Sequence, residues 1–210
     1  MNIMKKIEFE YQEKYGDISK DEVTRFYQLM NSIKITNKYK CHINDIIKKR
    51  HDIKWKCIDF IIYLEPKATP RPRINRFTNS FYVQGSKDNR DIFNKFFINE
   101  NIPMITTPCK FKCVSYLPIP KTMNPIETIL AELGLIYPIS KPDWDNLGKT
   151  YSDMIQNTLL LDDSLIIEGI SKKFYSYKPR IEIHMEYMES FDSIYNEEKI
   201  TKKIERKKKQ

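Results

Sequence analysis

One short stretch decides the fold of this chain: Lys141-Pro142-Asp143-Trp144-Asp145-Asn146-Leu147-Gly148-Lys149. The ring of Pro142 disfavours a helical Lys141 and so predicts an extended backbone at the start of the stretch. If the chain stays extended as far as Asp145, successive side chains point in alternating directions. The carboxylates of Asp143 and Asp145 then face one spot, and Trp144 points away from them into the core.

A helix is predicted directly after this acidic pair, over residues 145–159, with Asp145 or Asn146 as its N-cap. Two stripes run along it at helical spacing. The polar stripe holds Asn146, Lys149, Asp153 and Gln156, and the apolar stripe holds Leu147, Tyr151, Met154 and Ile155. The polar stripe therefore begins at the acidic pair.

A second acidic pair, Asp162-Asp163, follows at a turn before the apolar run 165–170. The run predicts a strand, and we expect helix and strand to pack together and bring the second pair back to the first. Carboxylates gathered at one place repel each other unless a cation neutralises them. The alternative is structural, because Asp-x-Asp is common in loops and caps, and Asp162-Asp163 can be ordinary turn chemistry.

Oxygen ligands without His or Cys favour a hard ion, so Mg²⁺ is the expected metal, with Mn²⁺ able to take its place. A carboxylate-held metal beside a lysine, here Lys149, has what phosphodiester hydrolysis needs: a polarised phosphoryl oxygen, an activated water and compensation of the leaving charge. The three histidines, His42, His51 and His184, form no cluster along the chain, so a zinc site is not favoured.

The middle of the chain alternates between strand and helix patterns. Strands are predicted over 57–64, 111–117 and 180–187, with a hairpin around Asn79-Ser80. Helices are predicted over 87–99 and 125–133, the second ended by Gly134 as a left-handed cap. Strands interleaved with helices indicate an α/β or α+β fold with a mixed sheet. Cys109 and Cys113 would share one face of a strand and are interpreted as packing residues.

The N-terminal part has a different pattern. Ser19-Lys20-Asp21-Glu22 is a capping box and predicts a helix after it, and a second amphipathic stretch runs as far as Arg50. We therefore expect a helical extension over 1–54, an α+β domain over 55–189 and a basic tail over 190–210.

The net charge of +8 is partly local, because the last ten residues alone carry a net +5. A basic tail suggests an electrostatic contact with nucleic acid, with an anionic membrane surface or a solvated end as alternatives. The membrane alternative has little support, because the tail has no strong apolar face. A second basic segment, Pro70-Arg71-Pro72-Arg73 with Arg76, is either a solvated loop or a proline-stiffened contact for phosphates, and we favour the contact.

Composition restricts the class of protein. The chain has 210 residues, of which 40% are hydrophobic and 12% aromatic, enough for a packed core. No apolar run is long enough for a membrane span, and the first residues do not look like a signal peptide. Four cysteines are too few for a disulfide framework, so a reducing cytoplasm is the expected location.

Taken together, these residues resemble the signature of the RusA-type Holliday junction resolvases, nucleases common in bacterial prophages and phages. The resemblance rests on Lys141-Pro142-Asp143-x-Asp145-Asn146-Leu147-x-Lys149, Asp153 and Asp162-Asp163-Ser164, and covers roughly 55–188. It implies a homodimer with a mixed sheet that binds four-way DNA junctions in recombination and repair. It also implies that two opposed strands are cut symmetrically with Mg²⁺.

The resemblance also implies roles for single residues. Asp143, Asp145 and the second acid of the later pair, Asp163 rather than Asp162, would bind the metal, and Lys149 would be the catalytic cation. The DNA contacts it implies are Arg71, Arg73, Arg76, Lys141, Lys172 and Lys173. The competing function is a non-catalytic branched-DNA-binding recombination accessory protein on the same fold. The intact acids and Lys149 favour the enzyme.

Overall fold

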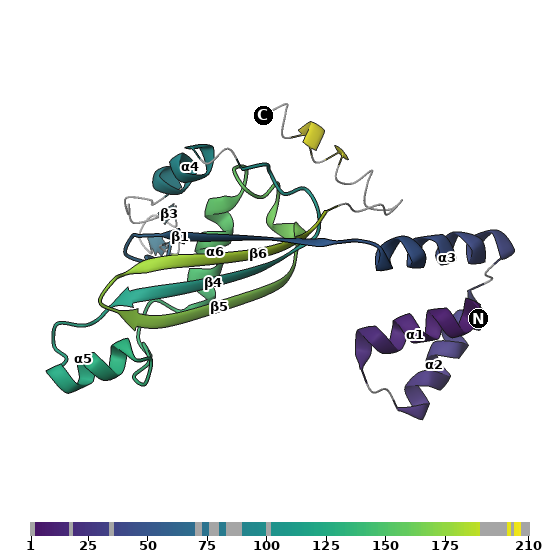
Figure 1. Ribbon diagram of the computed structural model, residues 1–210, viewed down its shortest axis with the longest axis horizontal. Coiled ribbons are helices and arrows are strands. Elements are labelled where there is room, and N and C mark those ends of the chain that lie inside the picture. Colours follow the sequence, from purple (N-terminus) through teal and green to yellow (C-terminus); the bar gives the residue numbers. More distant parts are fainter. Residues whose placement is uncertain are drawn as a thin grey trace. The chain divides into compact units, whose positions relative to one another are not determined.

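A mixed sheet of four strands, in the order β1-β6-β4-β5, forms the centre of the fold (Figure 1). Its strands are β1 (Trp55–Ile62), β4 (Cys109–Pro118), β5 (Ile166–Ser176) and β6 (Arg180–Met188). Strand β6 is antiparallel to both β1 and β4, whereas β4 and β5 run parallel. The predicted α+β class with a mixed sheet and helices is thus confirmed.

The computed structural model describes residues 3–16, 19–33, 36–69, 73–75, 80–82, 90–99, 102–189, 201–202 and 204–206. The chain divides into two compact units, one built on Met1–Ile53 and one on Lys54–Phe191. The sheet belongs to the second unit. None of the described helices is both long and apolar enough to cross a membrane.

One face of the sheet carries the hydrophobic core. Along β6, the alternating residues Ile181, Ile183 and Met185 are almost completely buried, as the strict alternation in the sequence predicts. Cys109 and Cys113 of β4 are also fully buried, and burial raises the pKa of each thiol to about 12. Both cysteines are therefore packing residues, as expected.

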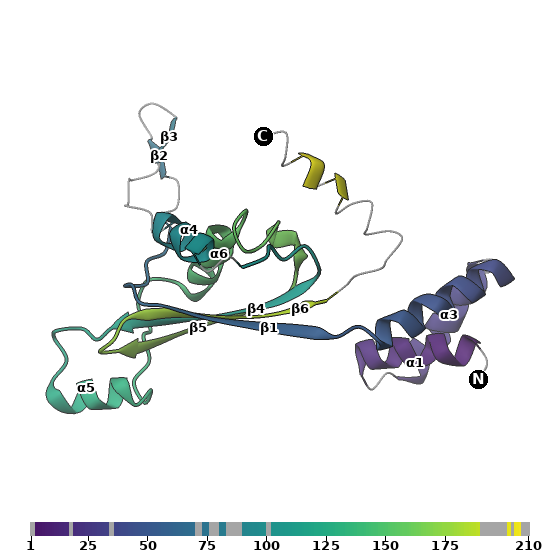
Figure 2. The same ribbon diagram turned by 45° about the horizontal axis from the view of Figure 1, so that its top comes forward.

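Helices lie on both sides of the sheet. The helices of this unit are α4 (Arg90–Asn99), α5 (Pro125–Glu132) and α6 (Trp144–Ile155), and a single 3-10 turn, η1 (Asp163–Leu165), precedes β5. Helices α4 and α6 lie on one side of the sheet, and α5 lies on the other (Figure 2). The α5 helix ends as predicted, because Gly134 adopts the left-handed conformation with φ 72°.

The first unit consists of α1 (Ile3–Tyr15), α2 (Lys20–Ser32) and α3 (Asn37–His51). The predicted capping box is present, with Ser19 and Glu22 each accepting from the other's backbone N–H. Phe26 of α2 is buried, and its ring lies 4.7 Å from that of Tyr11 on α1. Helix α1 was not predicted, because no capping signal precedes it.

Two smaller features lie near segments outside the described residues. The predicted hairpin is confirmed by antiparallel pairing between β2 (Arg73–Asn75) and β3 (Ser80–Tyr82). In the C-terminal segment, residues 201–202 and 204–206 are helical, and Ile204 packs against the hydrophobic core. The basic tail is therefore anchored by one apolar side chain, which the interpretation of it as a purely charged segment did not include.

Candidate functional site

The site is built around the start of α6. The helix begins at Trp144, with Asp143 as its N-cap, and the N–H of Leu147 donates to the carbonyl oxygen of Asp143 (3.1 Å) to close the first turn. The predicted extended backbone through Asp145 is therefore wrong. Because residues turn by about 100° each in a helix, Asp143 and Asp145 do not point the same way.

The indole of Trp144 is 61% exposed, so its predicted place in the core is also wrong. The cause is the earlier start of the helix, whose N-cap is Asp143 instead of the predicted Asp145 or Asn146. Leu147, Thr150, Tyr151, Met154 and Ile155 supply the buried side of α6 instead, which confirms the predicted apolar stripe. The helix therefore presents Trp144 to solvent between the two acidic residues.

Contacts with strand β5 hold the start of α6 in place. The Ser171 hydroxyl donates to the carbonyl oxygen of Trp144 at 2.7 Å. Gly148 lies so close to this strand that a Cβ atom there would stand 3.0 Å from the Cβ of Ser171. A glycine at 148 thus lets the first turn of α6 rest directly on β5.

Lys173, two residues farther along β5, fastens the loop before the helix. Its ammonium group donates to the carbonyl oxygens of Ser140 (2.8 Å) and Pro142 (2.9 Å), and the Lys141–Pro142 peptide between them is cis. The predicted contact of Lys173 with DNA stays a prediction beside these two bonds. Its ammonium group is engaged with the protein, and its role is to position the backbone next to Asp143.

The start of the basic loop is fastened to the other side of α6. The N–H of Thr69 donates to the Thr150 hydroxyl (2.8 Å), and the Asn146 amide donates to the carbonyl oxygen of Thr69 (3.3 Å). The N–H of Lys67 donates to the Tyr151 hydroxyl (2.9 Å), and burial raises the pKa of that phenol. The segment that leads into the predicted DNA-binding arginines therefore starts at the candidate site.

The remaining predicted basic residues are either exposed or outside the part of the chain that the structure describes in full. Arg71 and Arg76 lie outside the described residues, and Arg73 begins β2 without a described side chain. Lys141 and Lys172 are exposed. Lys149 is exposed one turn after Asp145 on α6, at the i, i+4 spacing that brings side chains together on a helix surface.

The second acidic pair has two different environments. Asp162 caps η1, and its carboxylate accepts from the N–H of Ser164 at 3.1 Å. This is the turn chemistry that the sequence left open as an alternative. Asp163 is the first residue of η1 and is exposed. Asp163 is thus the member of the pair whose side chain faces solvent.

The two acidic pairs lie at different levels of the same strand. The start of α6 rests beside Ser171, whereas Asp163 precedes the first residue of β5, Ile166. Five strand residues separate those levels, which corresponds to about 16 Å at ~3.3 Å per residue. These levels are those of Ser171 and Ile166, and the return of the second pair to the first stays a prediction. Among the described residues, no group of three or more His, Cys, Asp or Glu side chains could hold a metal ion.

The donor chemistry of the site fits a hard divalent cation in kind but not in number. Asp143 and Asp145 offer only oxygen atoms, at the positive end of the α6 dipole. Among the residues that the structure describes, their third expected companion, Asp163, does not join them in a group that could hold a metal ion. A single chain therefore supplies two of the three carboxylates at this place.

The histidines lie elsewhere. On the sheet, His184 of β6 contacts Asp59 of β1 (2.7 Å) and Glu186 (3.4 Å), and in the first unit His51 contacts Glu10. These contacts involve neither of the two acidic pairs. The raised pKa of His184, caused mainly by its hydrogen bond with Asp59, concerns the sheet alone.

Comparison with known proteins gives one family match and one curated relative that are informative here. The family model described as endodeoxyribonuclease RusA matches residues 64–186, which include both acidic pairs and all of α6 and β5. A curated relative from Bacillus subtilis (strain 168), the uncharacterized protein YqaN, is 31% identical over 134 residues. The alignment covers 60% of this chain and 94% of that relative.

Proposed function

Because the chain belongs to the RusA family of endodeoxyribonucleases, we propose that it resolves four-way DNA junctions by Mg²⁺-dependent, symmetric cutting of two opposed strands. The proposed setting is recombination and repair, in a prophage or its bacterial host. The observation that carries the proposal is the start of α6, where two acidic residues and Lys149 are held on a rigid support from β5.

The proposed metal ligands are Asp143, Asp145 and Asp163. Carboxylate oxygens suit Mg²⁺, and Mn²⁺ would be accepted as well. When bound, such an ion supplies an activated water and neutralises charge on the phosphate. Because the described residues of one chain show no group of three acidic side chains that could hold a metal ion, we propose that a homodimer completes the set, with Asp163 contributed by a second copy.

The chain's own residues have separable tasks in this proposal. Ser171 and Lys173 fix the backbone on either side of Asp143, so the acidic residues are in place before DNA arrives. The ammonium group of Lys149 would stabilise the charge that develops on the phosphoryl oxygens. Lys141 and Lys172 would contact phosphates, as would Arg71, Arg73 and Arg76 at the end of the loop that starts on α6.

The competing function is binding of branched DNA without cleavage. It is supported by one observation: the described residues of a single chain do not gather three metal-binding side chains. It would still use the basic loop and tail as an electrostatic contact with DNA. The family membership and the retained acids make cleavage the better-supported function.

One cleavage assay, analysed on a gel, distinguishes these two functions. A labelled four-way junction and a linear duplex with the same arm sequences are incubated with the full chain, with and without Mg²⁺. Cleavage of the junction at two symmetric positions, only when Mg²⁺ is present, is the expected result. Binding without cleavage under all metal conditions would favour the accessory protein, and equal cleavage of the linear duplex would remove junction selectivity from the proposal.

A further inference from the structure

Trp144 differs from the other exposed apolar side chains of the second unit in its place on α6. By the spacing i, i+3, i+7 it lies on the same side of the helix as Leu147 and Tyr151, which are fully buried. Its indole is nevertheless 61% exposed. The apolar stripe of α6 therefore extends one residue beyond the core, at the end of the helix that carries Asp143 and Asp145.

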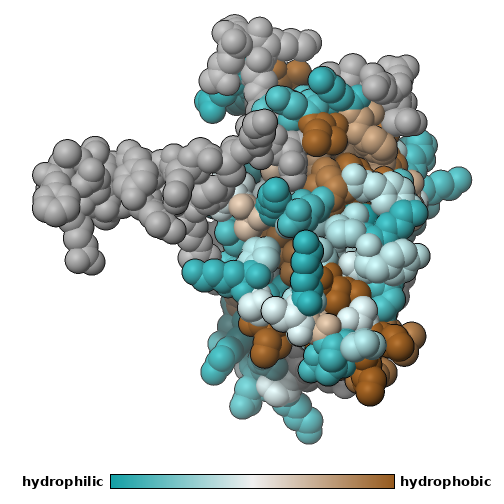
Figure 3. Space-filling view, turned by 90° about the vertical axis from the view of Figure 1, so that its left-hand side faces the viewer, coloured by the Kyte–Doolittle hydropathy of each residue, from teal (hydrophilic) through white to brown (hydrophobic). Residues whose placement is uncertain are grey.

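Exposure alone does not give this residue a function. Figure 3 views the side of the molecule on which α5 lies in Figure 1 and shows apolar side chains at the surface there among hydrophilic ones. Exposed apolar residues that stand singly are normal on protein surfaces. What distinguishes Trp144 is that both of its neighbours in the chain are proposed metal ligands. Its side chain leaves the backbone between the two acids of the proposed cutting site.

The backbone that carries the indole is held on both sides. The carbonyl oxygen of Trp144 accepts from the Ser171 hydroxyl at 2.7 Å. Two residues earlier, the carbonyl oxygen of Pro142 accepts from the ammonium group of Lys173 at 2.9 Å. A side chain on such a support loses little freedom when it binds a ligand, so less of the binding energy is spent on ordering it.

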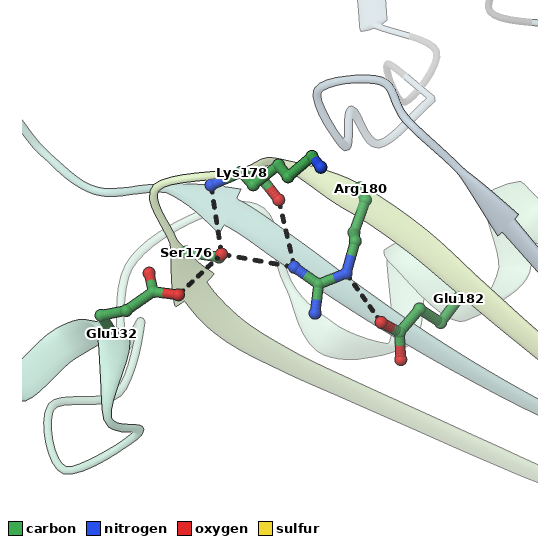
Figure 4. A network of polar contacts seen from close by, with 5 residues as sticks. All are labelled: Glu132, Ser176, Lys178, Arg180 and Glu182. Carbon is green, nitrogen blue, oxygen red and sulfur yellow. Dashed lines mark hydrogen bonds and ion pairs between the residues drawn. The ribbon is translucent and has the colours of Figure 1, made fainter.

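The connection from α5 to α6 is held at its start as well. Glu132, the last residue of α5, accepts from the Ser176 hydroxyl (3.2 Å) and from the N–H of Tyr177 (2.7 Å). Figure 4 shows the Glu132 carboxylate beside Ser176, whose hydroxyl oxygen also accepts from Arg180 (3.3 Å). The segment that leads to Trp144 is therefore bonded at both ends to β5 or the turn after it.

The groups around the indole indicate what it can bind. An indole between two carboxylates is poorly suited to a protein interface, whose core is depleted of charged residues, or to an anionic membrane. A nucleobase presents a flat apolar face of comparable size, and aromatic side chains stack on bases of every identity. Lys141 and Lys149 are exposed and lie within five residues of Trp144, where they can hold phosphates of the same strand.

We propose that Trp144 stacks on a base at the branch point of the junction and so favours branched over linear DNA at the cutting site. In a linear duplex every base already stacks on its neighbours, and freeing one costs energy. At a branch point, where strands change partners, the stack is more easily opened, so the indole can take a neighbour's place at lower cost. This inference rests on the proposed function, because it gives a residue of the same site the task of recognising the branch.

The first test uses fluorescence. The chain has two tryptophans, so Trp55→Phe leaves Trp144 as the only indole. This variant is titrated, without Mg²⁺, with a four-way junction and with a linear duplex of the same arm sequences, and gel shifts give the bound fraction. The junction should quench the fluorescence of Trp144, because the indole then stacks on a base. The duplex should quench it much less at equal bound fraction. In the control variant Trp144→Phe, the remaining Trp55 should respond to neither DNA.

The second test uses affinities, also without Mg²⁺. Trp144→Ala should weaken junction binding about 5- to 150-fold, the range for losing one stacked base, and leave duplex binding within about twofold. Trp144→Phe should keep most of the affinity, whereas Trp144→Leu should not, because leucine has no aromatic face. Tyr177→Ala is the matched control, since Tyr177 is an aromatic residue that is 77% exposed next to Glu132, and it should bind like the wild type. Unchanged thermal unfolding shows that the variants fold.

Two results would overturn the proposal. Equal quenching by junction and duplex would show that Trp144 does not distinguish branched DNA. A Trp144→Leu variant that binds as tightly as Trp144→Phe would show that stacking is not the source of the affinity.

The outcome is separable from the proposed function, because neither measurement requires cleavage. Quenching of Trp144 by a junction that is never cut would remove the nuclease proposal and leave the stacking role in place. Normal cutting by Trp144→Ala with unchanged affinity for the junction would do the reverse.

Discussion

Lys173 donates a hydrogen bond of 2.9 Å to the carbonyl oxygen of Pro142, the residue immediately before Asp143. A second bond to Ser140 makes this lysine a clamp on the loop that carries the first acid. The residue beside it, Lys172, points to the opposite face of β5, because side chains alternate along a strand. The two neighbouring lysines therefore allow a matched comparison.

We predict that Lys173→Met lowers the single-turnover cleavage rate about 10- to 100-fold, the usual effect of misplacing a reacting group by an ångström. The Mg²⁺ concentration for half-maximal rate should rise, since the acid loop is no longer held. Lys172→Met should weaken junction binding and leave the rate at saturating protein unchanged. Equal kinetic effects of the two substitutions would contradict a positioning role for Lys173.

The acidic residues should separate binding from cutting. Asp143→Asn, Asp145→Asn and Asp163→Asn are each expected to abolish cleavage, because each removes a proposed metal ligand. Junction binding should stay the same or become tighter, since a charge that repels phosphate is lost. Gel-shift assays without metal and cleavage assays with Mg²⁺ measure the two properties.

Asp162→Asn is the control for this series, because asparagine caps a helix about as well as aspartate. It should cut normally. An inactive Asp162→Asn beside an active Asp163→Asn would reverse the assignment within the pair. Full cleavage activity of both variants would show that the metal site lies elsewhere.

Lys149 is expected to act on the rate alone. Lys149→Ala should cost about two to four orders of magnitude in cleavage, the range for losing one preorganised charge at a developing oxyanion. Binding to junction and to duplex should hardly change, since this lysine is one cation among many. Single-turnover rates at saturating protein give the answer, and a drop in affinity that accounts for the whole loss would argue against a catalytic role.

The two basic segments should affect different steps of recognition. Removing residues 202–209 should weaken binding to junction and duplex alike and reduce the salt dependence by ~0.9 in the log–log slope per lost phosphate contact. Neutralising Arg71, Arg73 and Arg76 should instead reduce the preference for the junction, since this loop starts at the candidate site. Salt titrations on junction and duplex test whether the tail sets affinity and the arginines set the preference for the junction. This assignment is wrong if only the tail deletion changes the preference for the junction.

His184 should make stability depend on pH. Its hydrogen bond with Asp59 raises its pKa above the ordinary value of 6.5, and Glu186 acts in the same direction. A group whose pKa is raised on folding stabilises the fold below its unfolded pKa and loses that effect as the pH rises through the folded pKa.

Urea unfolding of the wild type and His184→Gln should therefore differ most below pH 6.5 and converge at higher pH. The side chain is about one-third exposed, so the difference should be modest. A difference that grows with pH would show that the ion pair with Asp59 is not its source.

The sequence predicts the architecture well because most of its signals are local. The capping box at Ser19, the glycine after α5 and the alternation of β6 each depend on a few adjacent residues, and the structure contains all three. The parallel pairing of β4 and β5 is consistent with the two helices between them, α5 and α6, since parallel strands need a long crossover.

The site was harder to predict, because its geometry depends on how α6 lies on β5. Moving the helix start from Asp145 to Trp144 changes the direction of both acids and exposes the indole. The contact between Gly148 and Ser171 sets the level of the helix on the strand. Neither this contact nor the clamp by Lys173 has a signal in the spacing of residues.

The chain enters the sheet at the start of β1 and leaves it at the end of β6, and these two positions lie side by side. Trp55 pairs with Met188, and the N–H of Glu189 donates to the carbonyl oxygen of Lys54 at 2.9 Å. Chain segments attached before residue 54 or after residue 189 can therefore be gained, lengthened or exchanged without changing a single strand register. The family match ends inside these limits, at residues 64 and 186. The strand pairing of the nuclease unit is thus complete without the segments that flank it, although Ile204 of the tail packs back onto its core.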